Sequence, residues 1–390
     1  MAIAAWLIAF AWVAKFFEAA RGLARVPNLL AAEYDAEPAG MPSITVIVPA
    51  RNEAANVRAC LESLLRQDYG NLRIVAIDDR SIDRTGAILE GLASDGRLDV
   101  MRVASLPAGW LGKTHAMAVA AQHAVAGWEP DYLLFTDADV VFREDAIRRS
   151  LVEVVASHAD HFVTLPTTVT KTPGESMILA YLQVISLWAV RTWRVADPKS
   201  KRDALGVGAF NLVRTEAYLR LGGFEVTPME ILEDLTFGRR VKEAGLRQRV
   251  ATAPGMVSVH WAAGVQGIVN GMTKNVFAVF HFRPALLLGA AVGMAVQCLG
   301  PVGFLAAEGT RLPAVIALTA VVGLYWLSSR TSRISPVYAV MFPVGAVLVV
   351  YAMLRSMVIT VRQGGVTWRG TFYPLDELRR HDRADAHLVS

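Results

Sequence analysis

Short apolar runs alternate with segments of helical periodicity between residues 42 and 262. The strand-like runs are 44–49, 72–78, 98–103 and 132–136, and the helical segments between them are 56–66, 83–92 and 114–125. The runs are apolar throughout rather than at every second position, which is typical of strands buried on both faces. The pattern predicts an α/β domain with a mostly parallel sheet and helices on both faces.

After residue 139 the alternation is less regular. We expect strands at 161–169, 206–213 and 257–261, with a further strand around Val250, and a polar-faced helix at 233–244. The segment 176–193 is apolar on nearly every face, but Lys171 and Arg191 bracket it closely, so we expect a buried or interfacial helix rather than a membrane span.

Long apolar runs lie outside this domain. The run at 1–17 has no basic residue before Lys15 and no clear cleavage site, so it predicts a signal anchor rather than a removed signal peptide. The later runs are 285–307, 312–328 and 336–354, each about long enough to cross a ~30 Å hydrocarbon core. Pro343 makes the last run the best candidate for a broken helix.

These patterns divide the chain into five parts. They are an N-terminal membrane anchor at 1–28, the α/β domain at 42–262, an interfacial helical segment at 263–284, a transmembrane block at 285–361 and a basic tail at 362–390. Lys15, Arg21 and Arg25 follow the anchor, so the positive-inside rule predicts a multi-pass protein of the cell inner (plasma) membrane with a cytoplasmic α/β domain. An outside N-terminus followed by three full spans would place the tail outside, whereas the arginines of the tail favour the inside; the sequence leaves this open.

Composition supports the membrane assignment. The 390 residues are 54% hydrophobic and only 19% charged, and the mean hydropathy is +0.37. The net charge of +4 is mild and no Lys/Arg tract is present, which excludes nucleic acid as an expected partner. The two cysteines, Cys60 and Cys298, lie in different regions and predict no disulfide framework.

Acidic residues follow the predicted strands at four positions: Glu53, Asp79, the pair Asp137 and Asp139, and the pair Glu233 and Asp234. Ligands of open α/β sheets bind outside the carboxyl ends of the strands, so the acids that follow strands should meet in one crevice. Asp137 and Asp139 could hold Mg²⁺ or Mn²⁺, with a diphosphate completing the oxygen shell. A carboxylate at Asp79 could accept a hydrogen bond from a base or ribose hydroxyl.

Each of these residues also has a simpler structural reading. Asp79 could form an Asx turn, although Ser81 or Asp83 is a better cap for the next helix, and Glu53 and Asp234 stand where helices start. His260 ends the last strand and is either structural or a further metal ligand. The segment 109–114 contains Gly-Lys-Thr, but Pro107 stands where a phosphate-binding loop needs glycine, so Lys113 reaches a diphosphate or substrate hydroxyl by another geometry or is a surface lysine.

Taken together, the motifs resemble those of glycosyltransferase family 2, the inverting transferases with a GT-A fold. The matching segments are 46–53, 78–85, 112–113, 137–139, 222–224 and 233–234. The resemblance implies a nucleotide-diphospho-sugar donor bound by Glu53 and Asp79, a divalent metal on Asp139, and Asp234 as the catalytic base that deprotonates an acceptor hydroxyl. From their own positions, Pro49, Lys113 and Asp137 are further candidate donor-binding residues, and His260 is a further candidate metal ligand.

The membrane segments are similar to those of family members that glycosylate lipids, which implies a lipid or small hydroxyl acceptor. Processive synthases and ceramide glucosyltransferases carry a Gln/Arg-x-x-Arg-Trp motif after the base. Residues 265–275 of this chain lack that motif, and Lys274 is the candidate substitute for its arginine. A processive polysaccharide synthase therefore remains a weaker alternative. So do a transport protein that hydrolyses ATP through Lys113 and a membrane scaffold with a non-catalytic domain.

Overall fold

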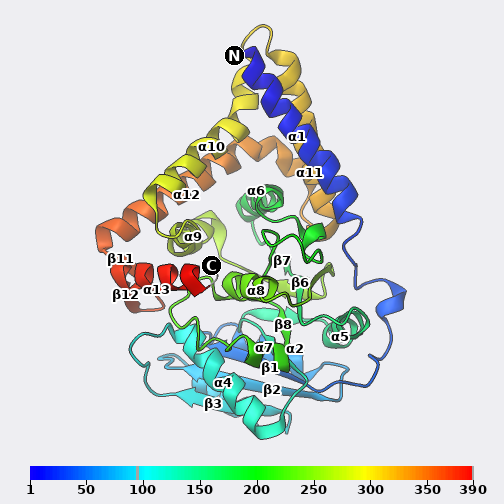
Figure 1. Ribbon diagram of the computed structural model, residues 1–390, viewed down its shortest axis with the longest axis vertical. Coiled ribbons are helices and arrows are strands. Elements are labelled where there is room, and N and C mark those ends of the chain that lie inside the picture. Colours follow the sequence, from blue (N-terminus) through cyan, green and yellow to red (C-terminus); the bar gives the residue numbers. More distant parts are fainter. Residues whose placement is uncertain (94–95, 389–390) are drawn as a thin grey trace. The chain divides into compact units, whose positions relative to one another are not determined.

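The computed structural model describes residues 1–93 and 96–388, with the backbone alone for 382–388. The last two residues of the expected tail at 362–390 lie outside the described residues. The chain forms two compact units, each built from separate stretches of sequence (Figure 1). One unit comprises 26–167, 193–260 and the described residues 383–388, and the other comprises 1–25, 168–192 and 261–382.

The first unit, called here the sheet unit, is built on a seven-stranded sheet. Four parallel strands lie in the order β3-β2-β1-β4. Their bounds are β1 Ile44–Ala50, β2 Leu72–Asp79, β3 Leu98–Val103 and β4 Tyr132–Phe135. Because the strands are parallel, their carboxyl ends lie at one edge of the sheet. The acidic residues that follow these strands are therefore brought to the same edge.

The other half of the large sheet is mixed. Strand β8 (Asn211–Arg214) is antiparallel to both β4 and β6 (His161–Leu165), and β9 (Gln248–Thr252) is parallel to β6. The expected strand at 206–213 is therefore wrong in its first half, which is a loop. Gly206 lies so close to the backbone of Asp234 that this stretch has no room to continue as a strand with side chains on both faces.

A second, three-stranded sheet was not expected from the sequence. It has the order β5-β10-β7, with bounds β5 Val140–Phe142, β10 Val257–Val259 and β7 Thr167–Thr168. Strands β5 and β10 are antiparallel, and Val140 pairs with Val259. The expected single strand at 161–169 is thus divided between two sheets.

Helices cover both faces of the large sheet, which confirms the predicted α/β architecture. Alternate residues of β1 point to opposite sides, so Val46 joins one core cluster and Ile47 the other. The first cluster packs α2 (Val57–Leu65), α3 (Thr85–Leu92) and α5 (Ala146–Ala156) on the sheet. The second packs α4 (Gly112–Trp128), α7 (Thr215–Arg220) and α8 (Glu233–Glu243).

A short segment before β1 is fastened to the far edge of this sheet. Asn28 bridges Thr252 in parallel fashion, and the guanidinium of Arg149 donates to the carbonyls of Leu29 and Ala31 at 3.0 and 3.1 Å. The 3₁₀ helix η1 (Ala32–Tyr34) follows. The start of the sheet unit is therefore held by hydrogen bonds to β9 and α5.

The second unit, called here the helical unit, contains the apolar helices. Their bounds are α1 Ala2–Leu23, α6 Pro173–Ala189, α9 Gly264–Val279, α10 Pro284–Phe304, α11 Arg311–Ser332, η3 Pro336–Met341 and α12 Phe342–Gln363. The hairpin β11 (Gly365–Trp368) and β12 (Thr371–Pro374) and the helix α13 (Leu375–Leu388) follow, and η2 (Thr192–Arg194) lies where the chain passes between units. Helix α6 groups with this unit and not with the sheet that precedes and follows it in sequence.

Four helical segments of the described residues are long and apolar enough to cross a membrane: 2–23, 284–304, 311–332 and 336–363. The last begins as η3 and becomes α-helical at Phe342, with Pro343 in the first turn of α12, so the helix changes form at the expected proline. Within the helical unit, the indole of Trp12 donates to the carbonyl of Gln297 at 3.0 Å and packs edge-on against Trp188. These helices give the chain the character of a membrane-associated protein.

Candidate active site

The site lies at the carboxyl edge of β4, where two glycine-containing segments meet. Residues 205–210, called here the glycine loop, run beside the Asp-x-Asp turn. The hydroxyl of Thr136 donates to the carbonyl of Ala209 at 2.8 Å, and the N–H of Asp137 donates to the carbonyl of Gly208 at 3.1 Å. The turn and the glycine loop therefore hold each other in place.

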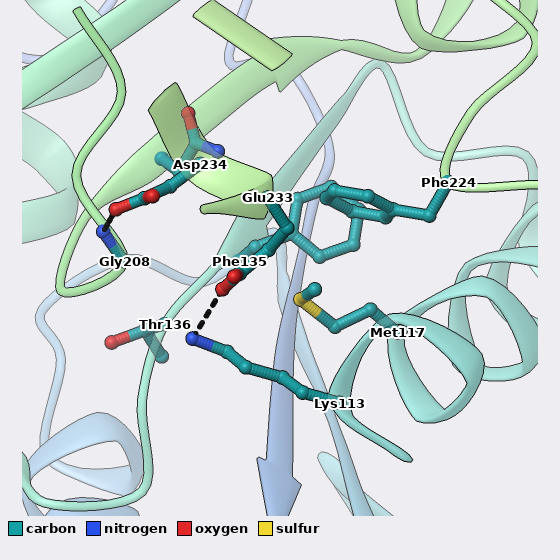
Figure 2. Close-up of a pocket in the computed structure, with 9 residues that line it drawn as sticks. Lys113, Met117, Phe135, Thr136, Gly208, Phe224, Glu233 and Asp234 are labelled. Atoms are coloured by element: carbon teal, nitrogen blue, oxygen red, sulfur yellow. Dashed lines mark hydrogen bonds and ion pairs between the residues drawn. The ribbon is translucent and has the colours of Figure 1, made fainter. Parts of the chain in front are cut away.

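Lys113 joins two of the predicted acidic positions. It lies in the first turn of α4, and its Nζ is 2.5 Å from Oδ1 of Asp137 and 2.6 Å from Oε1 of Glu233 (Figure 2). Burial alone would lower the pKa of Lys113, but Asp137, Glu233 and Asp234 together raise it above its ordinary value, so the ammonium stays charged. Lys113 is thus part of the site and not a solvated surface lysine.

Asp234 is held at both carboxylate oxygens by backbone N–H groups. Its Oδ1 accepts from the N–H of Leu235 at 2.8 Å, and its Oδ2 accepts from the N–H of Gly208 at 2.7 Å (Figure 2). Burial and the neighbouring Glu233 raise the pKa of Asp234 to about 7, against the opposing effect of Lys113. A carboxyl group with a pKa near neutrality can both hold and release a proton at physiological pH.

Glycine is required at two positions of the glycine loop because the site is crowded there. A Cβ on Gly206 would stand 1.7 Å from the carbonyl oxygen of Asp234, and a Cβ on Gly208 would stand 2.8 Å from Oδ2 of Asp137. Gly238 of α8 approaches the loop from the other side, and its Cβ would be 2.2 Å from the carbonyl oxygen of Leu205. The glycine loop and the first turns of α8 are therefore in backbone-to-backbone contact.

Asp139 lies beside Asp137, and the charge of Glu53 also acts on it. Burial, then Asp137 and Glu53, raise the pKa of Asp139 to about 6. A carboxyl group whose pKa is raised by neighbouring carboxylates lies in a region of uncompensated negative charge, and a hard divalent cation with oxygen ligands relieves this. The donor set at this edge therefore fits Mg²⁺ or Mn²⁺.

His260 follows β10 directly. Since Val259 pairs with Val140 in antiparallel register, the next pair in the same register is His260 opposite Asp139. No group of three or more His, Cys, Asp or Glu side chains is positioned to hold a metal ion by protein ligands alone within 1–93 and 96–381. A cation at Asp139 would thus need ligands from outside the chain, such as a diphosphate.

Asp79 ends β2 and is buried at 3% exposure. The guanidinium of Arg80 donates to both of its oxygens, at 2.7 and 3.0 Å, and that of Arg51 lies 3.6 Å away. A Cβ on Gly112 would be 2.3 Å from Oδ2 of Asp79, so this carboxylate faces the start of α4, one residue before Lys113. Asp79 and Lys113 therefore flank the same helix N-terminus.

The loop after β1 lies against the start of α3. Pro49 is paired with Ile77 inside the sheet, and the N–H of Glu53 donates to the hydroxyl of Thr85 at 2.8 Å. Asp83 accepts from the N–H groups of Thr85 and Ala54, at 2.9 and 3.1 Å, so it has the structural role expected for it. The carboxylate of Glu53 accepts from the side-chain amide of Asn56 at 3.0 Å, and its charge acts on Asp139.

A small pocket opens behind Lys113 and Asp234 (Figure 2). Met117, Phe135 and Phe224 form its apolar wall, and Asn211 and Thr136 supply polar atoms. Sequence reasoning missed the role of Glu233 as an ion-pair partner and those of Gly208 and Asn211. The Gly-x-Gly spacing at 206–208 was a sequence signal for a close backbone approach, but 206–213 was expected to be a strand.

The fold and the acidic site define a GT-A-type glycosyltransferase domain. Residues 45–216 match the sequence profile of "Glycosyl transferase family 2". Residues 45–216 are therefore similar to a glycosyl transferase family 2 domain, and the chain is a glycosyltransferase.

Comparison with known proteins extends the likeness beyond this domain. The chain is 24% identical over 348 residues to a 4,4'-diaponeurosporenoate glycosyltransferase of Staphylococcus aureus, covering 86% of this chain and 89% of that one. A protein of the same name from Staphylococcus haemolyticus is 26% identical over 238 residues, 60% of each chain. Among solved structures, a mannosyltransferase from Pyrobaculum calidifontis with GDP-Man and Mn²⁺ is similar at a TM-score of 0.50 and 18% identity, covering 91% of this chain and 98% of that one. This last likeness shows a shared fold.

Proposed function

We propose that this protein is a membrane-bound inverting glycosyltransferase that moves a sugar from a nucleotide-diphosphate sugar to a hydroxyl group of a lipid, with a divalent metal. The observation that carries the proposal is the pair of charged centres at one sheet edge. Asp234 has a pKa near 7, and Asp137 and Asp139 offer hard oxygen ligands. An inverting transfer needs a base on one side of the anomeric carbon and charge compensation for the leaving diphosphate on the other.

Asp234 is the proposed base. Two backbone N–H groups fix its carboxylate without using all its lone pairs, so the remaining ones are available to an acceptor O–H. The apolar wall of Met117, Phe135 and Phe224 keeps the surroundings of the carboxylate poor in water, which strengthens its affinity for a proton. Transfer would form the bond from the acceptor oxygen to the anomeric carbon, break the bond to the diphosphate, and leave the acceptor proton on Asp234.

Asp139 is the proposed metal ligand, with His260 as a second ligand from the opposite strand. A bound divalent cation would supply charge neutralisation for the diphosphate. Lys113 is the proposed contact to the donor diphosphate, and Asp137 would contact the donor through the cation. Pro49, Glu53 and Asp79 are the proposed contacts to its nucleoside. The similar mannosyltransferase structure is a complex with GDP-Man and Mn²⁺, which supports a donor and a metal of this kind.

A lipid acceptor is supported by the four apolar helices and by the names of the staphylococcal relatives. Those relatives are named for diaponeurosporenoate, which is the name of a carboxylate. A carboxylate acceptor is already ionised at neutral pH and needs no base. A hydroxyl acceptor therefore predicts that Asp234 is essential, and a carboxylate acceptor predicts that it is not.

The domain organisation expected from the sequence remains part of the proposal. The anchor at 1–28 and the block at 285–361 would hold the protein in the inner membrane, with the segment at 263–284 at the interface. The domain at 42–262 would face the cytoplasm, where nucleotide sugars are present, and the basic tail at 362–390 would follow the block.

Detergent-purified protein with Mn²⁺ or Mg²⁺ would be offered UDP-, GDP- and TDP-sugars, with and without total membrane lipid, and released nucleoside diphosphate would be measured. We expect lipid-stimulated, metal-dependent release from one donor, and loss of that release in Asp139→Ala. Labelled lipid product would identify the acceptor. Asp83→Asn provides a matched control, because Asp83 is a nearby aspartate that accepts from the N–H of Thr85, the first residue of α3.

Release from no donor would contradict the transferase proposal. Full activity of Asp234→Asn on a hydroxyl acceptor would remove the base assignment while leaving the transferase assignment intact. Long polymeric products would favour the processive alternative, and hydrolysis of ATP would favour a transport protein.

A further inference from the structure

Gln248 fastens the glycine loop to the start of α8. It is the first residue of β9 and is buried at 2% exposure. Its Oε1 accepts from the N–H of Leu205 at 3.0 Å, and its Nε2 donates to the carbonyl of Leu205 at 2.9 Å. The same Nε2 lies 3.0 Å from the carbonyl oxygen of Gly238 in α8. One side-chain amide thus completes both backbone bonds of a loop residue, as a neighbouring strand would.

A second buried side chain fixes the orientation of Gln248. Nδ1 of His161 lies 2.8 Å from Nε2 of Gln248, and Nε2 of His161 contacts Oδ1 of Asn211. One neutral tautomer of His161, with the proton on Nε2, fits both contacts, and the two N–H bonds of Gln248 are shared among Nδ1 of His161 and the carbonyls of Leu205 and Gly238. Burial lowers the pKa of His161 to about 4, which keeps it neutral. The network runs from β9 through β6 to Asn211, which lines the pocket.

The glycine loop in turn supplies one of the two bonds that hold Asp234. The N–H of Gly208 donates to Oδ2 of Asp234 at 2.7 Å. Gly206 and Gly238 leave no free space between the loop and α8, so a shift of the loop would change this bond directly. The remaining bond, from Leu235, is local to α8 and does not depend on the loop.

We propose that Gln248 is a positioning residue for Asp234, acting through the glycine loop, and that His161 orients Gln248 for this purpose. The proposal rests on the proposed function in so far as Asp234 is the base. A positioning role differs from general support of the fold because it predicts a local effect at Gly208 and an effect on turnover rather than on donor binding.

Gln67 provides the matched control. It is also a buried glutamine of the sheet unit, at 5% exposure. Its Nε2 donates to the carbonyls of Ser63 and Arg143 at 3.1 and 2.8 Å, and its Oε1 accepts from the N–H of Ile147 at 3.0 Å. Gln67→Met therefore removes the same number of backbone contacts without touching the glycine loop.

The first test is amide hydrogen exchange of the full chain in detergent, followed by mass spectrometry of peptides covering 205–210. In Gln248→Met we expect exchange at 205–208 to accelerate at least about tenfold, with strand β1 unchanged. Gln67→Met should leave 205–208 as in the wild type. Unchanged exchange at 205–208 in Gln248→Met, or equal acceleration in both variants, would overturn the proposal.

Two variants of His161 test the same positioning role if Gln248→Met does not fold. His161→Gln can still accept from Gln248 and donate to Asn211, whereas His161→Phe retains a ring beside Phe237 but loses both bonds. We expect exchange at 205–208 to be near the wild-type rate in His161→Gln and accelerated in His161→Phe. Equal behaviour of the two variants would contradict the role given to His161.

The second test is the kinetics of nucleoside diphosphate release with the nucleotide sugar found in the donor panel. We expect kcat to fall at least about tenfold in Gln248→Met, with the donor KM within about twofold of the wild type. Accelerated exchange at 205–208 combined with an active Asp234→Asn would mean that the base assignment fails. An inactive Asp234→Asn combined with wild-type exchange and kcat in Gln248→Met would mean that this inference alone fails.

Discussion

The ammonium of Lys113 lies 2.5 Å from the carboxylate of Asp137, the first acid of the Asp-x-Asp turn. The same ammonium lies 2.6 Å from Glu233, at the start of α8. A single cation therefore connects the turn after β4 to the helix that carries the proposed base. A divalent cation that binds Asp137 has to share it with this ammonium, and a diphosphate would compete with Asp137 for the same ammonium.

Replacement of Lys113 by methionine should destabilise the sheet unit and alter cation binding. Glu233 is only 7% exposed and would lose its counter-charge, whereas Asp137, at 40% exposure, is partly screened by solvent. We expect a loss of about 2 kcal/mol in unfolding free energy. In the donor-free protein we expect tighter Mn²⁺ binding, measured by calorimetry, because the competing ammonium is gone.

Lys199→Met is the control for Lys113→Met, since Lys199 is an exposed lysine of the same unit. It should leave both the melting temperature and Mn²⁺ affinity at the wild-type values. Weaker Mn²⁺ binding in Lys113→Met than in the wild type would show that the lysine does not compete with the cation.

Gly206→Ala adds a single methyl group but should strongly reduce activity or stability. The new Cβ would meet the backbone carbonyl of Asp234 at 1.7 Å, and backbone atoms cannot move aside as a flexible side chain can. We expect at least a hundredfold loss of activity, or about 3 kcal/mol of lost stability. Gly127→Ala in α4 meets no atom within 4 Å and should be neutral or slightly stabilising in the same thermal unfolding and activity measurements.

Asp79→Asn should weaken nucleotide binding with little effect on turnover at saturating donor. The substitution retains the shape of the side chain but removes the charge that orders Arg80 and Arg51 beside α4. We expect the Kd for the nucleoside diphosphate to rise about tenfold, as measured by calorimetry. The half-buried Asp99, paired with His123, offers Asp99→Asn as a control that should bind like the wild type.

The rate at saturating donor should depend on pH through Asp234. The base must be ionised to accept a proton, and its pKa is raised to about 7, so activity should fall as the pH drops through this value. Glu233 and Asp137 act to raise this pKa and Lys113 acts to lower it. Lys113→Met should therefore move the acid limb of the pH–rate profile to higher pH, and an unmoved limb would show that another group controls it.

The parallel half of the sheet was readable from the sequence because its strands are buried on both faces. The run at 98–103 coincides with β3, and 72–78 differs from β2 by one residue. The acidic positions were readable for a related reason: a polar side chain directly after a buried strand has to stand at the sheet edge. Both inferences use only information local to a few residues.

The parts that the sequence did not reveal depend on contacts between distant residues. Leu205 completes its backbone bonds with Gln248, 43 residues later, and Lys113 finds Glu233 across the site. Strand β5 has three residues and forms only because β10 pairs with it. No local periodicity records these partners, so the loop at 206–210 resembled an apolar strand.

Helix α6 has a practical consequence for any attempt to isolate the catalytic part. It lies between stretches of the sheet unit in sequence, yet its Tyr181 packs against Phe342, and Gly345 has no room for a Cβ beside the same ring. A fragment cut at residues 42 and 262 would carry α6 without the helices that shield it from water, and would aggregate through that uncovered face. Truncation at the two ends of the chain would therefore not give a soluble catalytic fragment, because the apolar helix α6 lies in the middle of the sequence.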